Sequence, residues 1–119
     1  MPTFILNSNI PKPEPEIIEK IQQGCATILS EQIGKSQDFV MTALNFEQDL
    51  SFGNSSEPCA YTEVKNVGTL NPNLTNSMSR ELCRHIFSIL NISEDKIYIE
   101  FQESERHLWG WNGKTFHQS

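Results

Sequence analysis

The sequence carries the same order of elements twice, a strand, a helix and a second strand, with about sixty residues between the two copies. The predicted elements are a strand at 3–7, a helix at 14–33, strands at 39–46 and 59–67, a helix at 73–90 and a strand at 96–102. A strand–helix–strand unit makes a right-handed crossover between parallel strands. The sequence therefore predicts an α+β fold: two β-α-β repeats that form a four-stranded mixed sheet with both helices on one face.

Both predicted helices are amphipathic, because their apolar residues recur at steps of three and four. The stripe residues are Ile18, Ile21, Cys25, Ile28 and Leu29 in the first helix, and Met78, Leu82, Ile86, Ile89 and Leu90 in the second. The pair Gly34-Lys35 is a typical helix stop. The run at 39–46 is mostly apolar and is predicted to be buried on both faces. Residues 108–116 are expected to form a short terminal hairpin or an edge strand around Asn112-Gly113.

Two helices on one face leave the other face of the sheet uncovered. The second, third and fourth strands nevertheless carry apolar residues on both sides. Soluble monomers rarely expose an apolar patch of that size, so we expect another copy of the chain to cover it. The apolar pattern of the strands thus predicts that the chain forms an oligomer, but it does not predict the number of subunits.

Length, charge and cysteine content exclude several classes of protein. The 119 residues fit one domain, 1–119, and a net charge of −6 argues against a nucleic-acid partner. No run approaches the ~18 apolar residues of a membrane span, and the start does not read as a signal peptide, so a cytoplasmic location is expected. The three cysteines are widely spaced, as in a protein with reduced thiols. No metal is expected, because Cys83, His85, His107 and His117 lack ligand spacing.

Pro2 is the residue whose chemistry would be the most unusual in this chain. A small second residue favours removal of Met1, which would leave Pro2 with a free secondary amine. Such an amine titrates near ~7.7–8.0 in water, and an apolar pocket lowers its pKa further. A neutral amine at the start of a strand is a suitable general base at neutral pH. The alternative interpretation is that Met-Pro is a common start without functional meaning.

Several motifs spread along the chain resemble one family. They are the start Met1 to Pro11, the pair Gly34-Lys35, the block Phe52 to Ala60, Val67-Gly68, the run Asp95 to Ile99, and the ending Gly110 to Phe116. Together they resemble the macrophage migration inhibitory factor family of the tautomerase superfamily, essentially from end to end. The resemblance implies a homotrimer with active sites at subunit boundaries. It also implies cofactor-independent keto–enol tautomerisation of phenylpyruvate-type 2-keto acids.

The resemblance also assigns roles to individual residues. Pro2 would be the catalytic base and Lys35 would bind the substrate carboxylate, although a lysine at a helix end is often only solvated. The Val67 backbone would contact substrate, and a neighbouring subunit would contribute Tyr98. Trp111 and Phe116 would wall the pocket. Tyr98 could instead be an interface aromatic, and Trp111 and Phe116 ordinary core residues.

Two candidate site residues depart from the family pattern. Glu100 stands where the mammalian cytokine has asparagine, near the catalytic amine, and a carboxylate there would raise the pKa of that amine. Trp109 replaces a smaller aliphatic residue at the pocket rim, so bulky cyclic substrates should react less well than phenylpyruvate. Two alternatives to an enzyme stay open: a cytokine-like ligand exported without a signal peptide, and a non-catalytic trimeric binding protein. No residue identifies a receptor epitope.

Overall fold

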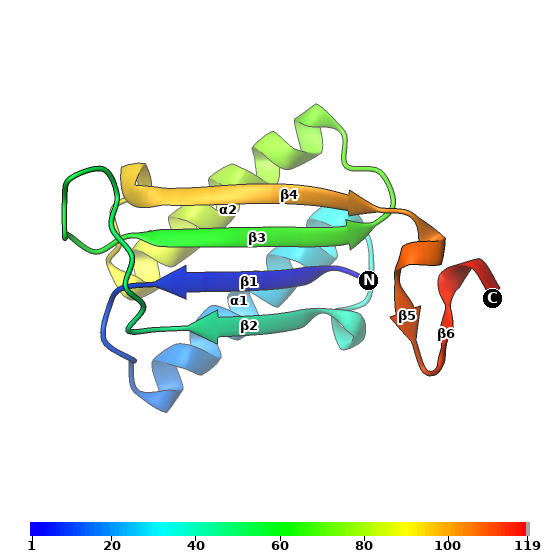
Figure 1. Ribbon diagram of the computed structural model, residues 1–119, viewed down its shortest axis with the longest axis horizontal. Helices are drawn as coiled ribbons and strands as arrows, with labels where there is room; N and C mark the ends of the chain where they lie inside the picture. Colours follow the sequence, from blue (N-terminus) through cyan, green and yellow to red (C-terminus); the bar gives the residue numbers. More distant parts are fainter. Residues whose placement is uncertain (119) are drawn as a thin grey trace.

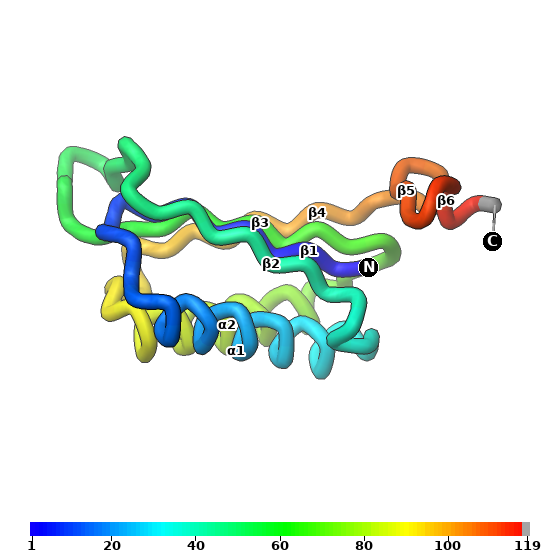
Figure 2. The backbone as a smooth tube through the Cα atoms, turned by 90° about the horizontal axis from the view of Figure 1, so that it is seen from below, coloured from blue at the N-terminus to red at the C-terminus, as the bar shows by residue number. Residues whose placement is uncertain are grey.

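The fold is a single four-stranded sheet with two helices packed against one of its faces (Figures 1 and 2). The computed structural model describes residues 1–118. The sheet strands are β1 (Thr3–Ser8), β2 (Met41–Asn45), β3 (Ala60–Val67) and β4 (Ile97–Ser104), and the helices are α1 (Pro15–Ile33) and α2 (Pro72–Leu90). Figure 2 shows both helices below the sheet and no helix above it. The predicted mixed sheet with two helices on one face is therefore confirmed.

The strand order β2-β1-β3-β4 follows from the two repeats. Each repeat pairs its own strands in parallel, β1 with β2 and β3 with β4. The repeats meet at the antiparallel pair β1 and β3, in which Thr3 is opposite Lys65 and Ser8 is opposite Ala60. The start of β1 consequently lies at the same end of the sheet as the ends of β3 and β4.

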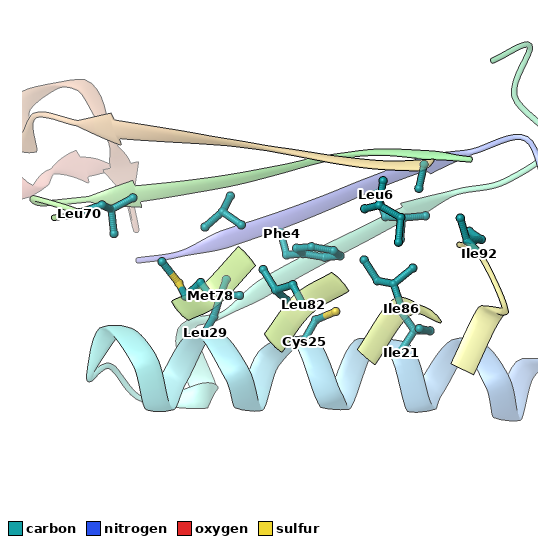
Figure 3. Close-up of a cluster of buried hydrophobic side chains, with 13 residues drawn as sticks. Phe4, Leu6, Ile21, Cys25, Leu29, Leu70, Met78, Leu82, Ile86 and Ile92 are labelled. Atoms are coloured by element: carbon teal, nitrogen blue, oxygen red, sulfur yellow. The ribbon is translucent and has the colours of Figure 1, made fainter. Parts of the chain in front are cut away.

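The core lies between the sheet and the helices (Figure 3). Burial alternates along β1, so that Phe4 and Leu6 point towards the helices while Ile5 lies on the opposite face. The helices contribute the predicted stripes, of which Ile21, Cys25, Leu29, Met78, Leu82 and Ile86 are fully buried. Burial of such side chains contributes roughly 1.5–3 kcal/mol each, so this layer contact is the main source of stability.

Local signals set the ends of both helices. Each has a proline in its first turn, where the missing N–H is not needed. The Asn71 side chain accepts a hydrogen bond from the Leu74 N–H at the start of α2 (2.9 Å). Gly34 ends α1 with φ of +80°, and Asn91 ends α2 with φ of +57°, both in the left-handed region.

The prediction that residues 39–46 form a strand buried on both faces is wrong for a single chain. Residues Gln37–Phe39 form a 3₁₀ turn, because the Ser36 hydroxyl accepts a hydrogen bond from the Asp38 N–H (3.1 Å). The strand starts only at Met41, and as an edge strand it has no buried residue. Met41 is 67% exposed on the face that no helix covers.

The chain continues past β4 into the predicted terminal hairpin, formed by β5 (Gly110–Trp111) and β6 (Lys114–Thr115). Asn112 and Gly113 make its turn, both with positive φ. In Figures 1 and 2 the hairpin lies beyond the end of the sheet at which β1 begins. Within residues 1–118, no helix combines the length and apolar character needed to cross a membrane.

Candidate functional site

Pro2 lies at the start of β1 and is fully buried. Its carbonyl accepts a hydrogen bond from the Met41 N–H (3.2 Å), which ties the start of β1 to the start of β2. The backbone around Pro2 is therefore part of the sheet rather than a free end. In the chain with Met1 attached the Pro2 nitrogen is an amide, and the free amine belongs to Met1.

Lys35 reaches the same end of the sheet because α1 stops at Gly34. Positive φ at Gly34 turns the chain out of the helix. The Lys35 ammonium then donates to the Val67 carbonyl (2.7 Å) and to Oδ1 of Asn66 (3.3 Å) at the end of β3. Asn66 is 2% exposed, so the two acceptors sit on a rigid, buried strand end. The cation is held in place rather than left to move in solvent.

The amino-terminal amine shares this environment. Burial, the hydrogen bond with Lys35 and the charge of Lys35 together lower the pKa of the Met1 amine from 8.0 to about 5, with burial the largest cause. All three causes disfavour the protonated amine. An amine at this position is therefore mostly neutral at pH 7 and keeps a lone pair.

A cavity of about 390 Å³ opens beside the amine. Its walls include Met1, Lys35, Phe39, Val67, Arg106 and Phe116. A second cavity of about 440 Å³ lies on the other side of Met1 and Phe39, with Trp109 and Trp111 in its wall. Met1 and Phe39 border both cavities, and Pro2 follows Met1 directly in the chain.

Aromatic rings form one side of the site. The rings of Phe39 and Trp111 meet edge to face, with centroids 5.8 Å apart and planes at 90°. The Trp111 and Phe116 rings are nearly parallel at 6.5 Å. The predicted wall residues Trp111 and Phe116 thus pack on each other, and Trp111 keeps half of its surface exposed. Such a wall can receive an aryl group.

The structure does not bring Tyr98 or Glu100 to this site within one chain. In the sheet Tyr98 is level with Tyr61 and Asn7, at the opposite end of β1 from Pro2. Tyr98 is 62% exposed, and the centroid of its ring lies 4.9 Å from that of Phe52. The proximity of these two residues to the amine can arise only between subunits, and it stays a prediction.

Glu100 has a partner of its own on the uncovered face. Its carboxylate accepts a hydrogen bond from the Tyr61 hydroxyl. That hydrogen bond, more than any other cause, raises the pKa of Tyr61 to about 12. Glu63 is directly opposite Glu100 across the pair of strands and acts on the Tyr61 pKa in the same direction. Glu100 is therefore set in an acidic patch at mid-sheet.

The sequence analysis missed three residues of the site: Asn66, Phe39 and Arg106. Asn66 could have been suspected as a polar residue in a buried strand. Phe39 was placed in a strand, and only the Ser36 turn moves it into the wall. Arg106 carries no local signal. Among residues 1–118, no group of three or more His, Cys, Asp or Glu side chains is placed to hold a metal ion.

Comparisons with known proteins agree with this architecture. The macrophage migration inhibitory factor of Meriones unguiculatus is 33% identical over 119 residues, covering 98% of this chain and 99% of that protein. The homolog from Brugia malayi is 30% identical over 116 residues, with the same coverage. Among solved structures, the homologue from Prochlorococcus marinus has a TM-score of 0.89 and 34% identity, covering 96% of this chain and 98% of that one. The Trichinella spiralis protein has a TM-score of 0.85 and 27% identity, covering 95% and 98%.

A family model described as macrophage migration inhibitory factor matches residues 1–117, almost the whole chain. The match includes every residue discussed above. This chain belongs to the macrophage migration inhibitory factor family.

Proposed function

We propose that the protein is a cofactor-independent keto–enol tautomerase that acts on phenylpyruvate-like 2-keto acids. After removal of Met1, the Pro2 nitrogen is the general base. The observation that carries the proposal is the position of the chain terminus, in a cavity where burial and Lys35 lower the pKa of its amine. A base with a pKa below neutrality is already unprotonated at pH 7.

The reaction needs only one proton relay. The Pro2 nitrogen takes a proton from the carbon next to the carbonyl, and the electrons of that C–H bond form the carbon–carbon double bond. The carbonyl π electrons move to oxygen, which then takes the proton back from the protonated amine. Composition and oxidation state do not change, so no oxidant or cofactor takes part.

Lys35 can hold the substrate carboxylate while keeping its own position. An ammonium has three N–H donors. Two of them are directed at the Val67 carbonyl and at Asn66. The third donor interacts with the terminal amine while Met1 is attached, and removal of Met1 would leave it for a carboxylate oxygen. The contacts with the protein would then hold the cation in place for the substrate. The aryl group of the substrate would pack against Phe39, Phe116 and Trp111.

The active form in this proposal is a homotrimer. Exposed Met41 and Tyr98 on the uncovered face support assembly, because burying such side chains is favourable. A neighbouring chain would then bring Tyr98 and Glu100 to the Pro2 cavity.

Three matched preparations test the proposal: protein with Met1 removed, protein with Met1 retained, and processed protein with Pro2→Gly. Mass spectrometry establishes the terminus of each. We expect the first to convert phenylpyruvate enol to the keto form and the other two to lose at least about 100-fold in kcat/KM, the usual scale for loss of a general base. Equal rates in all three preparations would contradict the proposal, and a family member without catalysis would then be the better description.

A further inference from the structure

The cavity on the other side of Met1 and Phe39, which we call the tryptophan cavity, differs in charge from the cavity beside Lys35. Its volume is about 440 Å³, and its wall includes both tryptophans of the chain, Trp109 and Trp111. Asp38 is the one residue with a charged side chain among the described residues that line it. This cavity therefore carries a negative charge, whereas the other has the Lys35 ammonium in its wall.

The Asp38 carboxylate has no cation of its own in the chain. The Ser36 hydroxyl accepts a hydrogen bond from the backbone N–H of Asp38 (3.1 Å), so the 3₁₀ turn holds the backbone of this residue and not its carboxylate. Among residues 1–118, the carboxylate takes part in no ion pair and no hydrogen bond. A charge beside apolar walls is screened less than one in open water, so it attracts a cation more strongly.

Aromatic rings and a thioether form most of the remaining wall. The rings of Phe39 and Trp111 meet edge to face, with centroids 5.8 Å apart, and Met41 lies beside them at the start of β2. Indole is the aromatic side chain that attracts a cation most strongly over its face. Trp109 adds a second indole where the family pattern has a smaller aliphatic residue. The wall thus combines apolar surface with rings that favour a positive group.

We propose that the tryptophan cavity binds an organic ammonium ion of the aryl-alkyl class. The ammonium group pairs with the Asp38 carboxylate, and the aryl group packs against the indoles of Trp109 and Trp111. The net charge of −6 on the chain favours the approach of a cation. The proposal does not depend on the tautomerase function, because no step of that reaction uses Asp38.

Two soluble probes that differ in charge test the proposal: benzylammonium and benzyl alcohol. Their dissociation constants are measured at pH 7 and low ionic strength on protein from which Met1 has been removed. Tryptophan fluorescence reports on the cavity directly, because both indoles of the chain line it. We expect benzylammonium to bind more tightly than benzyl alcohol. Equal dissociation constants for the two probes would overturn the proposal.

Asp38→Asn removes the charge and keeps the N–H that the Ser36 hydroxyl accepts. We expect the dissociation constant of benzylammonium to rise about 5-fold, as for loss of an exposed ion pair, and that of benzyl alcohol to stay the same. Asp49→Asn is the matched control, because Asp49 is also exposed but follows the other end of β2. An equal loss of benzylammonium affinity in both variants would overturn the proposal, since the net charge alone would then account for it.

Trp109→Leu locates the bound ion independently of Asp38. Leucine keeps an apolar wall and removes the ring, and Trp111 still reports by fluorescence. We expect the dissociation constant of benzylammonium to rise about 3-fold, and that of benzyl alcohol to rise less, because only the cation interacts with the indole face. A Trp109→Leu protein that binds benzylammonium as tightly as the parent protein would place the ion outside this cavity and overturn the proposal.

Discussion

At the scale of single residues, the site combines features that the sequence reveals with others that only folding creates. Pro2 could be suggested from the start of the chain, whereas Lys35 was assigned to the site only by the resemblance to the family. Val67 was expected only as a backbone contact of the substrate. Its role, with Asn66, as an acceptor for Lys35 could not be predicted, because that role depends on how far β3 extends. Arg106 could not be found either, since an exposed arginine after a strand has no distinguishing local pattern. The sequence alone does not show which residues far apart in the chain come into contact, and these residues depend on such contacts.

Glu100 offers a test at this scale with two readouts. Its hydrogen bond with Tyr61 lies within one chain and raises the pKa of Tyr61 to about 12. In Glu100→Gln we expect the pKa of Tyr61 to fall towards its ordinary value of 10.0, as measured by tyrosinate absorbance during an alkaline titration. A titration that Glu100→Gln does not change would show that the hydrogen bond is absent.

The second readout of Glu100→Gln concerns the assembled protein. If a neighbouring chain brings this carboxylate to the Pro2 amine, its removal lowers the pKa of the amine, because the protonated form loses a nearby negative charge. The acidic limb of the pH–rate profile should then move to lower pH. A limb that stays in place would contradict the predicted proximity of Glu100 and Pro2.

At the scale of elements, periodicity predicted the two helices well, and it failed where a turn competes with a strand. The stripes of α1 and α2 span many residues, so their signal is strong. Phe39 was misassigned to a strand because one hydroxyl, that of Ser36, stabilises a 3₁₀ turn at Gln37–Phe39 instead. That local contact has a functional consequence, since it carries Phe39 into the cavity wall.

The packing of α1 on α2 gives a prediction for Gly24. A Cβ at this position would lie 2.1 Å from ring atoms of His85, whose buried Nε2 has no hydrogen-bond partner. Alanine favours a helix over glycine by about 1 kcal/mol, whereas overpacking costs about 1–3 kcal/mol. We expect the change in the free energy of unfolding caused by Gly24→Ala to be at least about 1 kcal/mol less favourable when His85 is present than in a His85→Ala background.

Urea denaturation of the four proteins of this cycle measures the coupling. The Gly24→Ala change should stabilise the His85→Ala protein, because only the helix preference then remains. Additive effects of the two substitutions would show that the ring moves aside without cost and that the helices are not closely packed at this point.

At the scale of the whole molecule, one face of the sheet is incomplete. The helices cover the other face (Figure 2). Met41 and Tyr98 stay exposed in the single chain. The sequence analysis derived the need for a partner from the same imbalance, and could not derive the number of subunits, because that depends on the angle between contacting surfaces. The proposed trimer uses this face, and it links assembly to function through Tyr98 and Glu100.

Met41→Glu tests this link between assembly and activity. A charge on the uncovered face should oppose association, since it would be buried without a partner. We expect sedimentation velocity to show a shift from trimer towards monomer, together with loss of phenylpyruvate turnover. Phe87→Glu is the control, because Phe87 is also exposed (46%) but lies on helix α2. A Met41→Glu protein that stays trimeric would show that this face is not the interface.

The central claim concerns the protonation state of the terminal nitrogen in its cavity. ¹⁵N NMR titration of the processed protein, labelled at proline, follows the Pro2 amine directly. Burial and the Lys35 charge, the causes that lower the pKa of the Met1 amine to about 5, should place the Pro2 pKa well below the ordinary 8.0, and Lys35→Met should raise it. A Pro2 amine that titrates at its ordinary value, with or without Lys35, would contradict the account.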